Sequence, residues 1–362
     1  MAAALASAVL ISDLGCFVRL SLGLPALAGA GTQVSGPVAH DNLAVYFVHG
    51  SAARVAVPMS LEEALSKGRL KVGETGSVNE LTVENVGDDE VFVQAGDIVK
   101  GGRQDRVLSV DLLLPPHSGR VLMPAFCVEP GRWSARGQED PRQFSTSTAA
   151  MPSRQAKLAI QSYVAGASAT LIMEEQHPAD TAAAVRGRAD AAARQAEIWA
   201  EVRETQQQLS RSVGTPVAAT ASPSSLQLSL ENAKLREAQA AYFDALRSAE
   251  ESADDIVGYV FAINGKITGG DVYASSALFR KMWRKLLIAN ITEAISEKNG
   301  TRASPPSLDD VQAFLTAVDS APPSERALNS SVRLATGGGD HYLSTEIKRA
   351  DGGWVHRNYL AR

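Results

Sequence analysis

The sequence predicts an α+β domain, an antiparallel β sandwich or partly open barrel with a helical layer inserted in the middle of the chain. Short runs of strand-forming residues, separated by Gly, Asp and Pro, occupy both ends of the chain. A stretch rich in Ala, Gln and Glu, at about residues 150–250, lies between them and favours helix. The sequence shows no internal repeat, so we expect one α+β domain over residues 29–362.

The first 28 residues are small and apolar, and they end in Ala26-Leu27-Ala28, which has the small-x-small form of a signal-peptidase site. We therefore expect an export signal over residues 1–28 and a periplasmic or secreted protein. The alternative is a buried N-terminal helix in a protein that stays in the cytoplasm, because no Lys or Arg precedes the first apolar run. After cleavage the chain keeps only Cys127, which excludes an intramolecular disulfide.

The N-terminal β elements follow in order. The run 43–48 is rich in β-formers and ends at His49-Gly50, which predicts a first strand. A short helix begins after Ser60, with Glu63 at the capping-box position and Gly68 as the stop. Closely spaced strands separated by turn residues are then predicted at 81–84, 91–93, 107–114 and 120–123.

Two helical segments are predicted in the middle of the chain, 151–212 and 226–248, joined by a flexible connection at 213–225. Asn264-Gly265 between strand formers predicts a β-hairpin with a type I′ turn. An amphipathic helix follows at 275–297, and we expect its basic run, 280–285, on the solvated side. The chain closes with predicted strands at 332–335, 342–347 and 354–356.

Two segments concentrate charge beside glycine, residues 96–106 and residues 127–133. Arginine makes planar two-donor contacts, tryptophan stacks and glutamate accepts from hydroxyls, so together they suit a polar, partly flat ligand. The candidate ligand-binding residues are Asp97, Lys100, Gly101, Gly102, Arg103, Gln104, Arg106, Cys127, Glu129, Arg132 and Trp133.

Each of these motifs also has a structural interpretation. Gly101-Gly102 with its neighbouring cations suits an anion, but a hairpin with a glycine bulge explains it equally well. Glu129 and Arg132 suit either a ligand or a simple ion pair that fixes the turn. Cys127 suits a nucleophile only with a base nearby, and nothing in the sequence places a histidine beside it.

The composition narrows the classes of partner. A net charge of −5 argues against a general nucleic-acid binder, and no apolar run after residue 28 is long enough to span a bilayer. No spacing typical of metal ligands and no established enzyme signature is present, so we predict no metal site, and the cofactor is unknown. The oligomeric state stays open.

The sequence resembles a bacterial family of unknown activity. The resemblance rests on the glycine-rich segment, the 127–133 segment, Trp199, the Ile263-Asn264-Gly265-Lys266 turn and the terminal Val355-His356. This family is the ARG and rhodanese-phosphatase-superfamily-associated protein domain, where ARG is ADP-ribosylglycohydrolase. The resemblance covers about residues 41–360. It implies nucleotide or ADP-ribose metabolism by association only, and it carries over no catalytic residue.

Three functions are therefore considered. The first is a binding or accessory module for a small polar or anionic ligand, with a nucleotide-derived compound as one candidate, held between the glycine-rich turn and the segment Glu129 to Trp133. The second is a hydrolase or transferase with Glu129 or Asp97 as general base and Arg132 as electrostatic stabiliser. The third is a structural or protein-interaction domain whose helical middle is the contact surface.

Overall fold

The structure is a computed structural model that describes residues 33–50, 56–166, 182–247, 254–300, 303–329 and 331–362. The predicted export signal, residues 1–28, lies outside the described residues. The predicted fold class is confirmed: the protein is α+β with antiparallel sheets, one of which is nearly closed and barrel-like.

The largest sheet has eight strands in the order β1-β2-β12-β13-β17-β16-β15-β14, and every neighbouring pair is antiparallel. Its strands are β1 (Gln33–His40), β2 (Leu43–His49), β12 (Ile256–Ile263), β13 (Lys266–Tyr273), β14 (Ser324–Ala327), β15 (Val332–Gly338), β16 (Tyr342–Arg349) and β17 (Trp354–Ala361). The predicted first strand is β2, which is buried along almost its whole length because β1 and β12 flank it. The chain therefore joins its N-terminal and C-terminal parts in one sheet.

The other strands form a six-stranded sheet, β11-β7-β8-β10-β5-β4, and a three-stranded sheet, β3-β6-β9. They are β3 (Met59–Ser60), β4 (Leu70–Glu74), β5 (Glu80–Asn85), β6 (Val91–Val93), β7 (Ile98–Gly101), β8 (Arg106–Leu108), β9 (Leu112–Leu114), β10 (Gly119–Cys127) and β11 (Phe144–Thr146). Only β3 and β6 pair in parallel among these described strands.

The prediction of one strand over 107–114 is wrong, because β8 and β9 belong to different sheets. Polar side chains hold the bend between them. The Ser109 hydroxyl donates to the carbonyl of Pro124 at 2.7 Å, and an Asp111 carboxylate oxygen accepts from the Ala95 amide at 2.7 Å. An apolar run cannot be distinguished from a continuous strand by its pattern when the interruption is itself buried.

The helices are α1 (Leu61–Ser66), α2 (Arg154–Gly166), α4 (Ala182–Val213), α5 (Leu226–Leu230), α6 (Ala233–Leu246), α7 (Ser276–Ser296) and α8 (Leu308–Asp319). The capping box of Ser60 and Glu63 is present at α1, as predicted. The single helix predicted at 226–248 is instead two helices, because the Asn232 side chain caps α6 by accepting from the amides of Lys234 and Leu235. Helix α8 was not predicted, although Ser307 and Asp310 give it a capping box.

The predicted hairpin at Asn264-Gly265 joins β12 to β13, and both turn residues have positive φ, 50° and 76°. Glycine is required at the second position for a further reason. A Cβ atom on Gly265 would lie 2.8 Å from Ala303 Cβ and 2.8 Å from the Ser304 carbonyl. The turn therefore selects glycine by conformation and by space.

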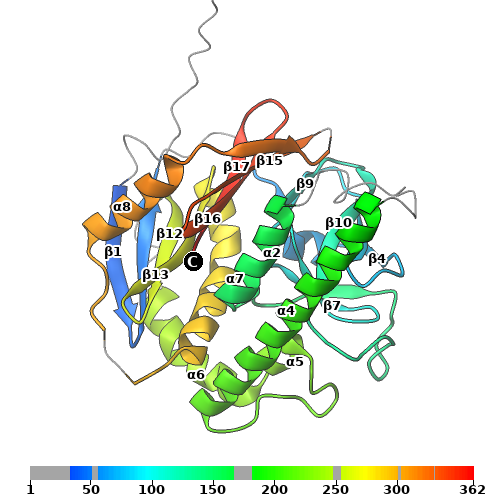
Figure 1. The fold of residues 1–362 in the computed structure, drawn as a ribbon, viewed down its shortest axis with the longest axis horizontal. Helices are drawn as coiled ribbons and strands as arrows, with labels where there is room; N and C mark the ends of the chain where they lie inside the picture. The colour runs from blue at the N-terminus through cyan, green and yellow to red at the C-terminus, as the bar shows by residue number, and fades with distance from the viewer. Residues whose placement is uncertain (1–32, 51–55, 167–181, 248–253, 301–302, 330) are drawn as a thin grey trace, which may run out of the picture.

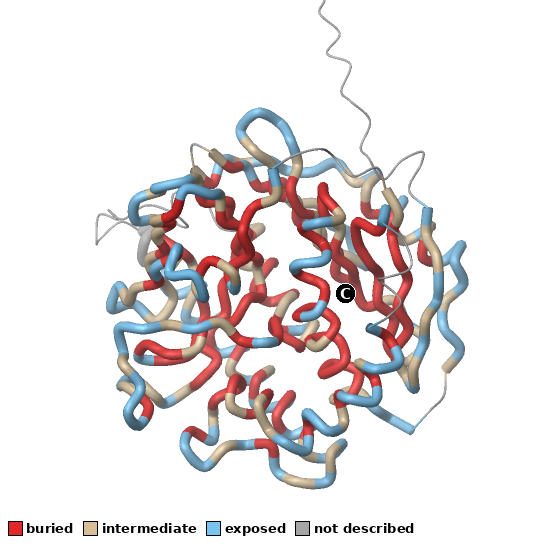
Figure 2. The backbone as a smooth tube through the Cα atoms, turned by 180° about the vertical axis from the view of Figure 1, so that it is seen from behind, coloured by how far each residue is buried: buried red, intermediate tan, exposed pale blue. Residues whose placement is uncertain are grey.

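Helix α7 lies between the eight-stranded sheet and helices α4 and α6, whereas α4 and α6 each keep an exposed face (Figure 1). Helix α7 packs on β12 and β13, α4 packs on β10, and the two helices contact each other. Trp283 of α7 lies at the centre of an aromatic cluster, with ring centres 5.4 Å from Phe47 and 5.5 Å from Tyr259. Figure 2 shows the buried residues concentrated in these strands and helices and the exposed residues in the loops.

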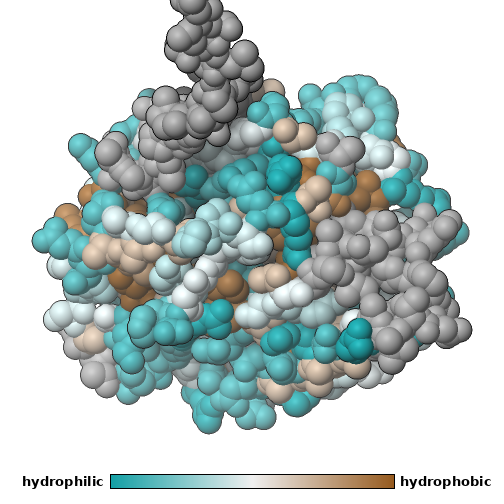
Figure 3. Space-filling view, turned by 45° about the horizontal axis from the view of Figure 1, so that its top comes forward, coloured by the Kyte–Doolittle hydropathy of each residue, from teal (hydrophilic) through white to brown (hydrophobic). Residues whose placement is uncertain are grey.

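Helix α8 covers the other face of the eight-stranded sheet, where Val311, Leu315 and Val318 join a second hydrophobic cluster. The face drawn in Figure 3 is mostly hydrophilic, with apolar residues in separate areas between polar ones. Among the described helices, none is long and apolar enough to cross a membrane.

Candidate functional site

The two charged segments singled out in the sequence are neighbours in space because β8 pairs with β10. In this antiparallel pair Arg106 lies opposite Cys127, so the start of β8 and the end of β10 lie side by side at the same end of the two strands. Gly101 and Gly102 both have positive φ, 123° and 56°, and they turn the chain back from β7 towards Asp105. The Gly101 amide donates to the Asp105 carboxylate at 3.0 Å, which closes this turn.

Four side chains at this end of the two strands form a buried ion-pair network, called here the turn network: Asp105, Glu129, Arg132 and Arg136. Arg132 lies 2.6 Å from the Glu129 carboxylate and 3.4 Å from that of Asp105. Arg136 lies 3.0 Å from Asp105 and 3.3 Å from Glu129. Each carboxylate contacts both guanidinium groups. Both carboxylates are fully buried, and these contacts replace their hydration.

Backbone and hydroxyl groups complete the turn network. Arg132 also donates to the carbonyls of Gly102 and Ser134. Ser222 donates to Glu129 at 2.6 Å and Ser225 donates to Asp105 at 2.9 Å. The prediction of a flexible connection at 213–225 is therefore wrong at its C-terminal end, because these two buried hydroxyls tie it to the network.

The pKa values of the two carboxyl groups in the turn network are shifted in opposite directions. Burial and the neighbouring charge of Glu129 raise the pKa of Asp105. Burial also acts to raise the pKa of Glu129, but hydrogen bonds from Arg132 and Ser222 outweigh it and the pKa is lowered. Hydrogen bonds to the ionised form therefore stabilise the charge of Glu129 against the cost of its burial.

Beside the network, Arg106 is fully buried, and its Nε donates to the Val78 carbonyl at 2.9 Å. Its two Nη atoms make no hydrogen bond with any described residue, and Glu74 Oε2 lies 3.8 Å away. The Trp133 ring, which is 41% exposed, lies 5.5 Å from the Arg106 guanidinium and 5.4 Å from that of Arg103. The predicted stacking residue therefore packs on arginines of its own chain.

Cys127 is buried, and burial raises the pKa of its thiol. The Gln195 side chain makes both backbone hydrogen bonds of Cys127, each at 2.9 Å, as a neighbouring strand would. The described histidines with ion-pair partners contact other residues: His49 contacts Asp255, His117 contacts Asp88 and His356 contacts Asp111. This geometry supports the small buried cysteine that the sequence left as one interpretation.

Three other candidate residues contact three different parts of the protein. Gln104 donates to the Glu129 carbonyl at 3.3 Å and so belongs beside the turn network. Asp97 forms a buried ion pair with Lys285 of α7. The prediction that the whole basic run 280–285 is solvated is therefore wrong for Lys285. Lys100, a residue of β7, lies 2.7 Å from Glu231.

Asp97 lies near a second buried network, called here the histidine network: Asp111, His356 and Asp271. His356 Nδ1 lies 2.6 Å from Asp111 and Nε2 lies 3.0 Å from Asp271. Tyr259 and Asn358 also hydrogen-bond to Asp271. Burial acts to lower the pKa of His356, but the two carboxylates outweigh it and raise the pKa to about 9. This network joins β13 and β17 to the segment before β9.

Glu231, the ion-pair partner of Lys100, lines a cavity of about 400 Å³, called here the arginine pocket. Its lining residues come from β11 and the chain after it, α5, α6 and α7: Thr146, Thr148, Ala149, Gln227, Leu230, Glu231, Arg236, Gln239, Ala240, Phe243, Arg284 and Ile288. On α6 the residues 236, 239, 240 and 243 share one helical face, and on α7 residues 284 and 288 do so. Two helix faces therefore form its walls.

The pocket carries more positive than negative charge. Arg236 and Arg284 are exposed and make no ion pair with any residue that the structure describes. Arg284 lies over the Phe243 ring at 5.5 Å. Glu231, the acidic lining residue, is already paired with Lys100 and accepts from Gln227 at 2.9 Å. Gln227 is buried, and its Oε1 has no hydrogen-bond partner among the described residues.

The model of one protein family matches residues 31–360, nearly the whole chain; its description is ARG and Rhodanese-Phosphatase-superfamily-associated Protein domain. The chain belongs to this family. The resemblance inferred from the sequence is thereby confirmed. No curated protein and no solved structure matches the chain.

Sequence reasoning missed several residues that matter in this member of the family. Arg136 lies just beyond the 127–133 segment, and only the fold shows that it pairs with Asp105. Arg236 and Arg284 lie on exposed helix faces, where a charged residue is ordinary. Within the described residues no group of three or more His, Cys, Asp or Glu side chains is placed to hold a metal ion.

Proposed function

We propose that this protein is a binding or accessory module that holds a small anionic ligand, bearing a phosphate or carboxylate group, in the arginine pocket. One observation carries the proposal: two arginines on neighbouring helices, Arg236 and Arg284, line one cavity without an ion-pair partner among the described residues. A guanidinium group binds phosphate and carboxylate oxygens through two parallel N–H donors.

The rest of the lining suits the uncharged part of such a ligand. Thr146 and Thr148 provide hydroxyls, and Gln227 provides a buried carbonyl oxygen that accepts from a ligand hydroxyl or amine. Phe243 and Ile288 provide apolar surface. Pockets that bind small molecules have this composition, a mostly apolar wall with a few convergent polar groups.

The ligand is placed here and not at the turn network because of what the arginines there already bind. Arg132 and Arg136 contact Glu129, Asp105 and backbone carbonyls, so an anion would have to displace buried carboxylates. For the same reason no feature favours Glu129 as a general base. Its carboxylate accepts from Ser222 and two arginines and is fully buried.

Phosphate-bearing compounds are the first ligands to test, because the family's name records an association with ARG and rhodanese-phosphatase proteins. We suggest calorimetric titration with inorganic phosphate, nucleoside mono- and diphosphates, sugar phosphates and dicarboxylates. Arg284→Gln and Arg236→Gln should each weaken binding of the best compound about tenfold or more, since a charge-assisted contact contributes about 1.5–3 kcal/mol.

Arg280→Gln is the matched control, because Arg280 lies one turn earlier on α7, is exposed and pairs with Asp254 outside the pocket. It should leave the affinity unchanged. Binding that survives both pocket substitutions, or the absence of binding by every anion of the panel, would overturn the proposal.

Export is a further part of the proposed function, with cleavage after Ala28. The mass of the protein isolated from its native host tests it. A chain that retains residues 1–28 would contradict export.

A further inference from the structure

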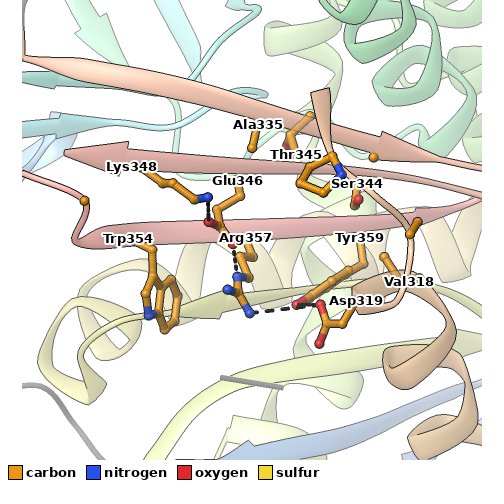
Figure 4. A pocket seen from close by; sticks show the side chains of 14 residues that line it. Val318, Asp319, Ala335, Ser344, Thr345, Glu346, Lys348, Trp354, Arg357 and Tyr359 are labelled. Atoms are coloured by element: carbon orange, nitrogen blue, oxygen red, sulfur yellow. Dashed lines mark hydrogen bonds and ion pairs between the residues drawn. The ribbon is translucent and has the colours of Figure 1, made fainter. Parts of the chain in front are cut away.

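A separate pocket of about 340 Å³ lies on the outer face of the eight-stranded sheet, at the end of α8 (Figure 4). Three strands form its floor. Directly opposed residues of neighbouring strands share a face, and Ser344 lies opposite Tyr359 while Glu346 lies opposite Arg357. Val318 and Asp319, from the last turn of α8, lie above them.

The charges of this pocket, called here the sheet pocket, compensate one another. Its acidic lining residues are Asp319 and Glu346, and its basic ones are Lys348 and Arg357. Arg357 forms an ion pair with Glu346 and lies 4.0 Å from Asp319. Lys348 pairs with Glu346 at 3.2 Å. The sheet pocket therefore has no net charge with which to attract an ion.

Asp319 has bonding capacity that its own chain does not use. Its Oδ1 accepts from the Tyr359 hydroxyl at 3.2 Å, whereas its buried Oδ2 has no hydrogen-bond partner among the described residues. Burial raises the pKa of this carboxyl. The residue also ends a helix, where the negative end of the helix dipole disfavours a carboxylate. Asp319 therefore keeps one buried acceptor atom available beside the pocket.

Small residues leave room in part of the pocket lining. A Cβ atom on Gly337 would lie 2.7 Å from the Ser344 hydroxyl oxygen, so glycine at this position leaves room for that hydroxyl. Ala335 and Gly352 are further small lining residues. Figure 4 shows Trp354 and Asp319 on opposite sides of Arg357, and the Arg357 guanidinium lies 4.9 Å from the Trp354 ring centre.

We infer that the sheet pocket binds a neutral polyhydroxyl ligand, of the class of a mono- or disaccharide. A sugar hydroxyl donates to Asp319 Oδ2, and others bond to the Ser344 hydroxyl and to the ion-paired carboxylate of Glu346. The partly buried Trp354 offers an aromatic edge or face to sugar C–H groups. The volume lies within the range of small-molecule sites.

Charged ligands fit this pocket less well. A cation that approached Asp319 would be repelled by Arg357, which lies 4.0 Å from the same carboxylate. An anion would be repelled by Asp319 and would find Lys348 and Arg357 already paired. A hydroxyl donates a hydrogen bond without either repulsion.

The test is calorimetric titration of the protein with a panel of neutral monosaccharides and disaccharides, with amino sugars and sugar acids as charged comparators. We expect at least one neutral sugar to bind, and Asp319→Asn to weaken that binding about tenfold, because it removes a charged acceptor. Gly337→Ala should also weaken it, because the added methyl group displaces the Ser344 hydroxyl. This second substitution changes no charge and tests the site even if Asp319→Asn impairs folding.

Asp340→Asn is the matched control, an exposed aspartate in the turn between β15 and β16 that does not line the pocket. It and Arg284→Gln should leave sugar binding unchanged, which separates this site from the arginine pocket. The inference is overturned if no neutral sugar binds, if only charged comparators bind, or if both Asp319→Asn and Gly337→Ala bind the sugar as the unmodified protein does.

Discussion

Arginines of the turn network and arginines of the arginine pocket do different work. The side chains of Arg132 and Arg136 are 9% and 7% exposed, and both contact the same two carboxylates. Arg236 and Arg284 are exposed and have no ion-pair partner among the described residues. The arginines of the turn network therefore use their donors within the protein, whereas the arginines of the arginine pocket keep theirs available. The capacity to bind a ligand depends on unused donors.

The energetic reason lies in desolvation. Burying a charge costs several kcal/mol unless partners replace its hydration, so removing the partner of a buried ion pair is costly. An exposed arginine keeps its hydration until a ligand replaces it. Substitutions in the turn network should therefore lower stability and leave ligand affinity unchanged. Substitutions in the arginine pocket should lower ligand affinity and leave stability nearly unchanged.

The largest effect is expected for Glu129→Gln. This change removes one of the two carboxylates that neutralise Arg132 and Arg136, and breaking a buried pair in this way costs about 3–5 kcal/mol. Denaturation in urea measures it. Glu139→Gln is the control, because Glu139 pairs with Arg136 at the exposed edge of the network, and an exposed pair contributes less than about 1 kcal/mol. Equal losses for the two variants would break the comparison.

The pH dependence of the free energy of unfolding should distinguish the two buried networks. The histidine network contains a group that titrates near neutral pH, His356, whereas the turn network contains only carboxylates and arginines. His356 has its pKa raised from 6.5 to about 9 in the folded protein. Its contribution is therefore complete below the unfolded pKa and is lost as the pH rises through the folded pKa. A shift of this size corresponds to about 3 kcal/mol.

We therefore expect the free energy of unfolding to fall between pH 6.5 and about 9, as measured by urea denaturation across that range. His356→Gln should be less stable than the unmodified protein at the acidic end and should show a flatter profile. An unmodified protein with a flat profile in this range would show that Asp111 and Asp271 do not hold a charged imidazole.

A smaller effect is expected for Arg132→Lys, which keeps the charge but loses the planar pair of donors. Because Arg132 bridges Glu129, Asp105 and two backbone carbonyls, we expect a loss of about 1–3 kcal/mol in stability. Affinity for the best anion of the panel should not change. Anion binding that weakens while stability stays constant would return the ligand to the turn between Glu129 and Trp133.

Local signals in the sequence predicted much of the fold. The alternation and turn chemistry around Asn264-Gly265 and the capping box at Ser60 each depend on residues adjacent in the chain, and both were correct. The glycine-rich segment and the segment 127–133, singled out for their charge and glycine, lie side by side because β8 pairs with β10, whereas ligand binding by them stays a prediction.

The parts that were missed depend on contacts between residues far apart in the sequence. Ser222 and Ser225 lie in a stretch of Pro, Ser and Ala that is typical of a loop, and only the carboxylates they contact make them buried. Lys285 is charged on a helix face that also carries exposed cations, and it is buried because Asp97 faces it. No periodicity in the sequence contains that information.

The pairing of β2 with β12 has a consequence for biosynthesis. The apolar strand Leu43–His49 emerges from the ribosome early, but one of its two neighbours, Ile256–Ile263, is made more than half a chain later. Until then the β1–β2 hairpin has an unpaired apolar edge, which is the kind of surface on which nascent chains aggregate. A polypeptide truncated before β12 should therefore depend on chaperones, whereas the complete chain seals this edge itself.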